Sequence, residues 1–137
     1  MIQARSKNEL VVRLADGEEL TTCLAALKID SGVILNGVGM LRTLELGYWN
    51  GSDYDVQQID EPVELLSLQG NFACKGEERV LHCHATVAKR DGTAIGGHVI
   101  NATVHNTAEI FVRELLEIKL ERRLEESGLA GLYPRVK

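Results

Sequence analysis

Short runs rich in valine, isoleucine, threonine and leucine follow one another from residue 33 to about residue 104, and glycine or an Asp-Gly pair separates them. Such runs, bounded by turn residues, are typical of antiparallel strands joined by short connections. The predicted strands cover residues 33–36, 41–49, 53–59, 63–73, 79–90 and 98–104. Asn50-Gly51 and Asp91-Gly92 are the strongest signals for tight hairpin turns. Most of the chain is therefore predicted to form antiparallel sheet.

One helix is predicted near the N-terminus, after a strand at residues 10–14. Its apolar residues follow the i, i+3, i+4, i+7 spacing of a single buried helical face. They are Leu20, Cys23, Leu24 and Leu27. Asp16 is the predicted N-cap, with Glu19 three residues later as in a capping box, and Gly32 lies beyond the expected end.

The C-terminal part of the chain fits more than one interpretation. Residues 104–116 place apolar side chains at helical spacing, but Ile110-Phe111-Val112 fits a buried strand equally well. Residues 117–126 mix acidic and basic side chains at i, i+4 spacing, which is typical of the solvated face of a helix. Periodicity leaves the first segment open and predicts a helix for the second.

Composition and charge limit the class of protein. A length of 137 residues with 45% hydrophobic and 26% charged residues is typical of one globular domain. The formal net charge of -5 provides no overall positive field that would attract nucleic acid. No apolar run near the N-terminus indicates export or a membrane anchor, and three cysteines without a C-x-x-C pair suit a reducing compartment. We expect one domain, residues 1–137, in the cytoplasm and without a membrane partner.

Three of the four histidines lie close together in the sequence, in His82-Cys83-His84 and at His98. Residues two apart in a strand project from the same face, so His82 and His84 are expected side by side. The opposite face is apolar and consists of Leu81, Cys83, Ala85 and Val87. If a neighbouring strand brings His98 to the same face, three imidazoles form a known ligand set for Zn²⁺, with a fourth position open.

The position of His98 depends on the turn at Asp91-Gly92. A two-residue loop pairs Val99 with His84 and turns His98 to the wrong face. A three-residue loop, or a bulge at Gly96-Gly97, shifts the register by one residue and turns His98 back. The two-residue register has its own support, because it places three apolar residues on the apolar side: Ile100, Ala102 and Val104. In that alternative His82 and His84 are residues of a polar face and His98 is an unrelated turn residue.

Glu64 alternates with Leu65 on a predicted strand and is a candidate to orient an imidazole of the metal site. It fits the role of an exposed strand residue equally well. No phosphate-binding loop and no Gly-x-Ser-x-Gly nucleophile motif occurs, so the sequence does not support nucleophilic hydrolysis.

Several motifs occur in an order that resembles a known family. They are Gly37-Val38-Gly39-Met40-Leu41, Leu46-Gly47-Tyr48-Trp49, Glu61-Pro62-Val63-Glu64-Leu65-Leu66-Ser67-Leu68-Gln69-Gly70-Asn71, His82-Cys83-His84, Asp91-Gly92 and Gly96-Gly97-His98-Val99. Together they resemble the plants-and-prokaryotes-conserved (PPC) domain over residues 8 to about 116, which is nearly the whole chain.

The resemblance implies an α/β (α+β) fold, in which a mostly antiparallel β-sheet is flanked by helices, and assembly as a homotrimer. It also implies that residues 107–115 form a final strand. Prokaryotic single-domain members are commonly labelled predicted DNA-binding proteins. Some of them carry a metal held by histidines that match His82, His84 and His98. In plant members a separate basic AT-hook contacts DNA, and this chain has no such hook.

Three functional hypotheses follow. The first is a homotrimeric binding or regulatory protein in which His82, His84 and His98 hold zinc and a small ligand. The family label names DNA as its partner, whereas the negative net charge disfavours DNA binding. The second is a zinc-dependent enzyme, for which Glu64 is the candidate general base. The third is a trimeric interaction scaffold without chemistry. The sequence does not decide whether the protein is an enzyme, and it favours the first hypothesis.

Overall fold

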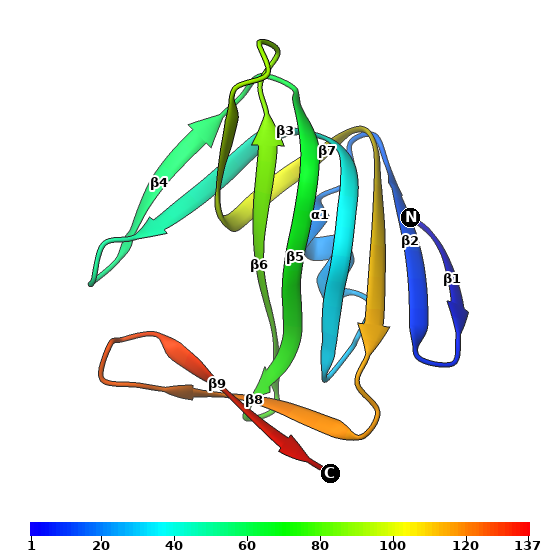
Figure 1. Cartoon of the computed structure of the whole chain (residues 1–137), viewed down its shortest axis with the longest axis vertical. Coiled ribbons are helices and arrows are strands. Elements are labelled where there is room, and N and C mark those ends of the chain that lie inside the picture. Colours follow the sequence, from blue (N-terminus) through cyan, green and yellow to red (C-terminus); the bar gives the residue numbers. More distant parts are fainter.

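The computed structural model describes residues 1–137 and contains nine β-strands and one α-helix (Figure 1). The elements are β1 (Ile2–Ser6), β2 (Glu9–Ala15), α1 (Leu20–Ala25), β3 (Gly32–Trp49), β4 (Tyr54–Ile59), β5 (Val63–Lys75), β6 (Glu78–Ala88), β7 (Ala94–Glu114), β8 (Ile118–Leu124) and β9 (Ala130–Val136). The prediction of a mostly antiparallel sheet is therefore confirmed.

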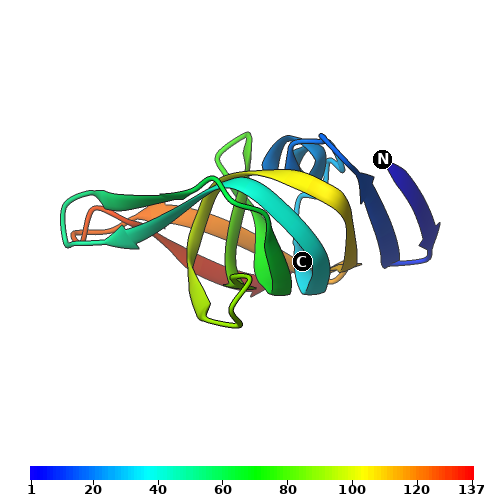
Figure 2. The ribbon, with the colours of Figure 1, turned by 90° about the horizontal axis from the view of Figure 1, so that it is seen from above.

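Four long strands close on themselves. β3 pairs with both β5 and β7, and β6 pairs with the same two strands, so the hydrogen-bonded circuit β3–β5–β6–β7 is continuous. β2 and β1 extend the sheet beyond β7, and β4 forms an arm with β3. The sheet is strongly curved when seen from above (Figure 2). Because β6 and β7 are held on both sides, the strands that carry the histidines have fixed neighbours.

Alternate side chains of the strands enter the core, as the two-residue period of a strand requires. The buried residues include Leu10, Val12 and Leu14 of β2, Cys83, Ala85 and Val87 of β6, and Leu20 and Leu24 of α1. The predicted apolar face of β6 is thus confirmed. Its opposite face carries His82 and His84.

The helix is shorter than the sequence analysis implies, and its cap is a different residue. Glu19 is the N-cap, and its carboxylate accepts hydrogen bonds from the backbone N–H groups of Thr21 and Thr22. Asp16 instead accepts a hydrogen bond from the N–H of Asn106 at 2.8 Å. α1 is the only helix, so the expected set of flanking helices is reduced to one six-residue element. It is too short to cross a lipid bilayer.

Residues 104–116 resolve as strand, since β7 runs without interruption from Ala94 to Glu114. The strand at residues 107–115 that the family resemblance implies is therefore present, although two further strands follow it.

The helix predicted for residues 117–126 is wrong. β8 and β9 form an antiparallel hairpin there, and the backbone N–H of Leu120 donates to the hydroxyl of Ser31. Residues two apart share a face of a strand, so Glu121 pairs with Lys119 and Arg123 on the same strand. A run of mixed charges is therefore compatible with a strand as well as with a helix, and tertiary contacts determine which of the two structures forms.

β5 and β6 approach each other very closely at Gly70, which lies opposite Cys83. A Cβ atom at Gly70 would lie 2.2 Å from the carbonyl oxygen of His82 and 2.7 Å from the Cα atom of Cys83. Both are backbone atoms, which cannot rotate away. Glycine at position 70 therefore allows β6 to hold His82 in its place.

We expect Gly70→Ala to lower the free energy of unfolding by about 1–3 kcal/mol, because the added methyl group overpacks a backbone contact. Urea unfolding of the variant and the natural protein measures the difference. Gln69→Ala is the matched control, since this neighbouring side chain is exposed and its loss should change stability by less than about 0.5 kcal/mol. Equal stability of Gly70→Ala and the natural protein would contradict the close approach.

Candidate metal centre

The hairpin between β6 and β7 determines which way His98 points. The pairs Ala88–Ala94 and His84–His98 lie opposite each other, which corresponds to a three-residue loop rather than a two-residue loop. Gly92 adopts a left-handed conformation, with φ of +85°, as the last residue of such a loop commonly does. The register is unbroken at Gly96-Gly97, so the loop and not a bulge at that point turns His98 toward His84.

A bulge further along β7 explains how His98 can lie on the histidine face while the apolar residues that follow it lie on the core face. On β3, Glu45 and Leu46 are consecutive, but their partners on β7 are Asn101 and Val99. Ile100 is therefore the extra residue, and it reverses the alternation of side chains beyond it. His98 can face the other histidines while Ala102 and Val104 remain in the core.

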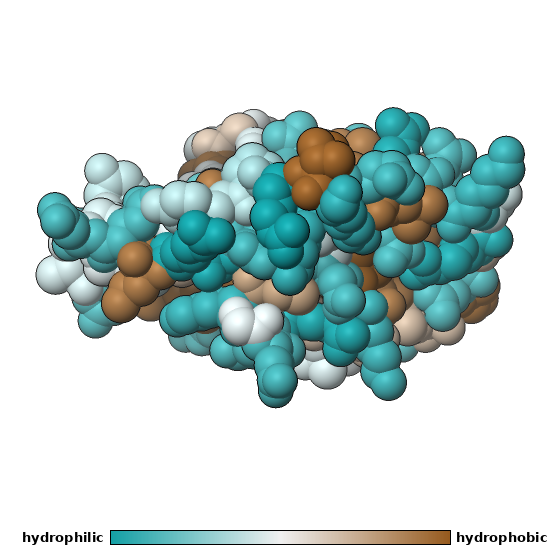
Figure 3. All heavy atoms as spheres, turned by 90° about the horizontal axis from the view of Figure 1, so that it is seen from below, coloured by the Kyte–Doolittle hydropathy of each residue, from teal (hydrophilic) through white to brown (hydrophobic).

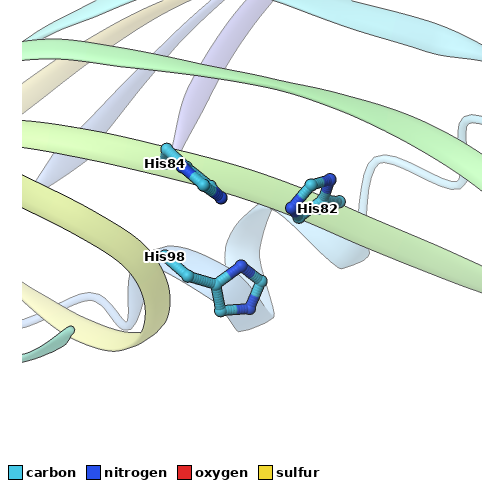
Figure 4. A group of neighbouring side chains, drawn as sticks. All are labelled: His82, His84 and His98. Atoms are coloured by element: carbon cyan, nitrogen blue, oxygen red, sulfur yellow. The ribbon is translucent and has the colours of Figure 1, made fainter. Parts of the chain in front are cut away.

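The three imidazoles converge on one point (Figure 4). The ring centroids are separated by 5.1 Å for His82 and His84, 5.2 Å for His82 and His98, and 5.5 Å for His84 and His98. Their side-chain nitrogens lie within 4.8 Å of one another, and no other histidine, cysteine or carboxylate joins the group. The structure thus brings together all three residues that the sequence singled out.

The chemistry of this three-imidazole donor set suits a metal ion. Nδ1 of His98 is buried and has no hydrogen-bond partner, so a bond to a ligand there would relieve an unsatisfied polar atom. Zn–N bonds of about 2.0–2.1 Å place the nitrogens closer together than the present 4.8 Å limit. The three rings must therefore move closer together for all of them to bind one ion.

The acid–base properties of the cluster also suit coordination, which requires neutral imidazole. Burial, together with the positive charge of Arg122 and the two neighbouring imidazoles, lowers the pKa of His82 from 6.5 to about 4. Burial and His84 lower the pKa of His98 as well. Both rings are therefore neutral near pH 7.

Residues from outside the hairpin complete the surroundings. The ring of Tyr54, on β4, stacks on His98 with centroids 4.7 Å apart. Arg122, on β8, lies against His82, with its Nη2 3.1 Å from Nδ1 of the imidazole. Nη2 also donates to Oδ1 of Asn71 at 2.8 Å, and Nη1 donates to the carbonyl oxygen of Ala130 at 2.9 Å.

The histidines border two hollows. One has a volume of about 260 Å³ and is lined by His82, His98, Tyr54, Arg122, Leu129 and Ala130, together with Val80 and Leu81. It lies between the β3–β4 arm and the β8–β9 hairpin, which extend toward the same side of the molecule (Figures 1 and 2). The other, of about 770 Å³, also contacts Tyr54 and His98 and reaches Thr21 and Thr22 of α1. A small molecule could therefore reach the cluster.

Glu64 does not belong to the site. It pairs with Ala88, four residues along β6 from His84, which corresponds to about 13 Å at the rise of a strand. It lines a separate hollow with Glu61 and Lys89. The hypothesis that Glu64 orients an imidazole or acts as a base near a metal is therefore wrong for the arrangement in this structure.

Arg122, Asn71 and Tyr54 were not identified from the sequence. Arg122 stands in a run of mixed charges that gives no sign of its contact with His82. Tyr54 lies at the start of the predicted strand 53–59, and Asn71 lies within the predicted strand 63–73. Only the folding of three distant segments around β6 shows that these residues share one site.

Residues 1–116 match the family model of the Plants and Prokaryotes Conserved (PCC) domain. The chain belongs to this family. The resemblance found in the sequence is thereby confirmed. No functionally curated protein matches this PCC-domain chain at a significant level.

Crystal structures of relatives show the same fold. A plant- and prokaryote-conserved protein from Pyrococcus horikoshii is 32% identical, with a TM-score of 0.85, and the match covers 99% of this chain and 96% of that one. A candidate DNA-binding protein from Bacteroides thetaiotaomicron is 28% identical, with a TM-score of 0.90 and 96% of each chain covered. A metal-containing protein from Archaeoglobus fulgidus is 28% identical, with a TM-score of 0.81, over 97% of this chain and 99% of that one. The likeness therefore extends into the β8–β9 hairpin, beyond the part matched by the family model.

The lowered pKa of His82 predicts how the metal-free PCC-domain protein responds to acid. Between about pH 6.5 and pH 4 the unfolded chain binds a proton at His82 that the folded chain does not. The free energy of unfolding should therefore decrease as the pH falls through this window. Urea unfolding of chelator-treated protein at about pH 7.5 and about pH 5 measures the decrease.

His82→Asn should weaken this pH dependence, whereas His105→Asn should keep it, because His105 lies outside the cluster. The same pH dependence in His82→Asn and in the natural protein would contradict the assignment to His82.

Proposed function

We propose that this protein binds a metal ion, with zinc as the expected ion, through His82, His84 and His98, and that the open coordination position receives a small ligand. The observation that carries the proposal is the convergence of three imidazoles from two strands, one of which, His98, has a buried and unpartnered Nδ1. The description of the Archaeoglobus fulgidus relative as metal-containing supports it.

Binding is favoured over hydrolysis among the roles that such a centre can have. A bound Zn²⁺ would act as a Lewis acid and could lower the pKa of its water to about 7. The groups around the histidines are Arg122, Asn71 and Tyr54, and no carboxylate lies within the cluster to act as a base. These residues are suited to hold and orient a ligand.

Replacement of one ligand tests the proposal. The natural protein, purified without chelators, should contain one metal ion per chain by elemental analysis, and His84→Ala should lose it because two imidazoles remain. His105→Ala is the control and should keep its metal, since His105 contacts Arg42 and Asp16 instead of the cluster. Stoichiometric metal in His84→Ala would contradict the proposed site.

The DNA-binding role described for the Bacteroides thetaiotaomicron relative has little support in the charges of this chain. Duplex DNA is bound through clustered lysine and arginine side chains on phosphates. Most of the basic side chains on the strands of this protein are paired with a carboxylate, as in Arg5–Glu114, Arg79–Asp30 and Arg113–Glu9. With a net charge of -5, the protein offers no cluster of free cations that favours DNA as the partner.

Self-association has support in the surface of the sheet, and a homotrimer is the assembly that we propose. Apolar side chains between 38% and 45% exposed lie on the adjacent strands β2, β3 and β7. They are Val11, Leu35, Val38 and Phe111. Exposed apolar side chains also occur on the β8–β9 hairpin, and at that end of the molecule they lie in separate patches among hydrophilic residues (Figure 3). Three free cysteines and no disulfide fit our further proposal of a cytoplasmic protein.

Light scattering during size-exclusion chromatography should give three times the 15.1 kDa mass of one chain. Phe111→Glu should reduce this mass, because it places a charge in the middle of the apolar strands. Val136→Glu is the control, since Val136 lies on β9, far from these strands in the order of the sheet, and should leave the mass unchanged. A monomeric mass for the natural protein would contradict the trimer.

A further inference from the structure

The contact between Arg122 and His82 is incompatible with a metal bound to His82. A guanidinium group has only donors, so Nδ1 of His82 must accept the hydrogen bond, and Nε2 of the neutral ring then carries the proton. Neither nitrogen has a free lone pair for a metal. Coordination through Nδ1 displaces Arg122 directly, and coordination through Nε2 moves the proton to Nδ1, which then faces another donor. Arg122 must withdraw from His82 in either case.

Two other contacts keep Arg122 beside the site when it lets go of His82. Nη1 stays bonded to the carbonyl oxygen of Ala130, and Nη2 keeps its second hydrogen for Asn71. The guanidinium is therefore held next to the metal position by β5 and by the β8–β9 hairpin.

Arg122 also has an unused donor and an unbalanced charge. Its Nε is buried without any hydrogen-bond partner, and Nε and Nη2 are the two nitrogens of one edge of the guanidinium. That edge is the one that receives an oxyanion in a bidentate manner. Arg122 takes part in no ion pair, whereas its neighbour Arg123 pairs with Glu121. A half-buried cation that lacks a carboxylate partner is suited to an anionic ligand.

We propose that the small ligand at the metal is an oxyanion of the carboxylate or phosphate type, and that Arg122 receives it through its Nε and Nη2 edge. The inference rests on the metal site proposed above. With one oxygen of the anion on the metal, Nε and Nη2 of Arg122 would donate hydrogen bonds to its remaining oxygen or oxygens. The hollow of about 260 Å³ between Arg122, His82, His98 and Tyr54 provides the space, and Leu129 and Ala130 would contact the apolar part of the ligand.

Cobalt-substituted protein provides a test without an activity assay. Protein treated with chelator is loaded with Co²⁺, whose visible spectrum reports its coordination, and is titrated with oxalate, with inorganic phosphate and with the uncharged oxamide. Calorimetry gives the dissociation constants. The natural protein should bind oxalate or phosphate with a change in the cobalt spectrum and should not respond to oxamide. The two anions distinguish a carboxylate ligand from a phosphate ligand.

Arg122→Gln should have two opposite effects. Affinity for the oxyanion should fall by about tenfold or more, because a charge-assisted hydrogen-bonded pair is lost. Affinity for Co²⁺ should rise, because His82 is released and a positive charge is removed beside the ion. Arg122→Lys keeps the charge without the two-donor edge and should also bind the oxyanion more weakly. Arg123→Gln, at the exposed neighbouring position, should leave both affinities unchanged.

Any other outcome contradicts one specific part of the proposal. Oxyanion affinity that is unchanged in both Arg122 variants overturns the role of Arg122. A parallel fall in cobalt and oxyanion affinity shows a merely structural role and overturns it too. If cobalt binds the natural protein but neither anion changes its spectrum, the oxyanion inference is wrong and the metal site stands. If no cobalt binds, the metal site fails and this inference fails with it.

Discussion

The register of the β6–β7 hairpin is the constraint on which the candidate site depends. A three-residue loop places His98 directly opposite His84, and antiparallel partners share a face of the sheet. A change of one residue in this loop would send His98 to the core side, since the alternation of side chains has a period of two. The bulge at Ile100 then restores the apolar alternation, so that one strand serves the site and the core in succession.

The closed circuit of β3, β5, β6 and β7 makes this register rigid. β6 is hydrogen-bonded to β5 along almost its whole length, and Gly70 permits the close contact beside His82. The three rings therefore start near one another before any ion arrives, which reduces the conformational entropy lost on binding. Burial and the charge of Arg122 also keep His82 neutral, so that coordination does not require the loss of a proton near pH 7.

The C-terminal hairpin adds a cation and apolar side chains to the surroundings of the three histidines. It brings Arg122 to His82 and supplies Leu129 and Ala130 to the adjoining hollow. The matched family model ends at residue 116, so this hairpin is contributed by the part of the chain beyond it. In the proposed site, Arg122 and the metal ion compete for His82. Metal binding would release the donor of Arg122 that an anion would use, and the two binding events would therefore be linked.

The sequence by itself determined the antiparallel sheet, the early helix with its buried leucines, the apolar face of β6 and the three histidines as candidates for one site. These features follow from local periodicity and turn residues, which a chain carries wherever it folds. Only the tertiary structure decided the loop length at Gly92, the strand conformation of residues 118–124, the exclusion of Glu64 and the presence of Arg122 and Tyr54 beside the histidines. The loop length follows from the pairing of β6 with β7. The other features depend on contacts between segments far apart in the chain, whose free energy outweighs the small local preferences of a charged run.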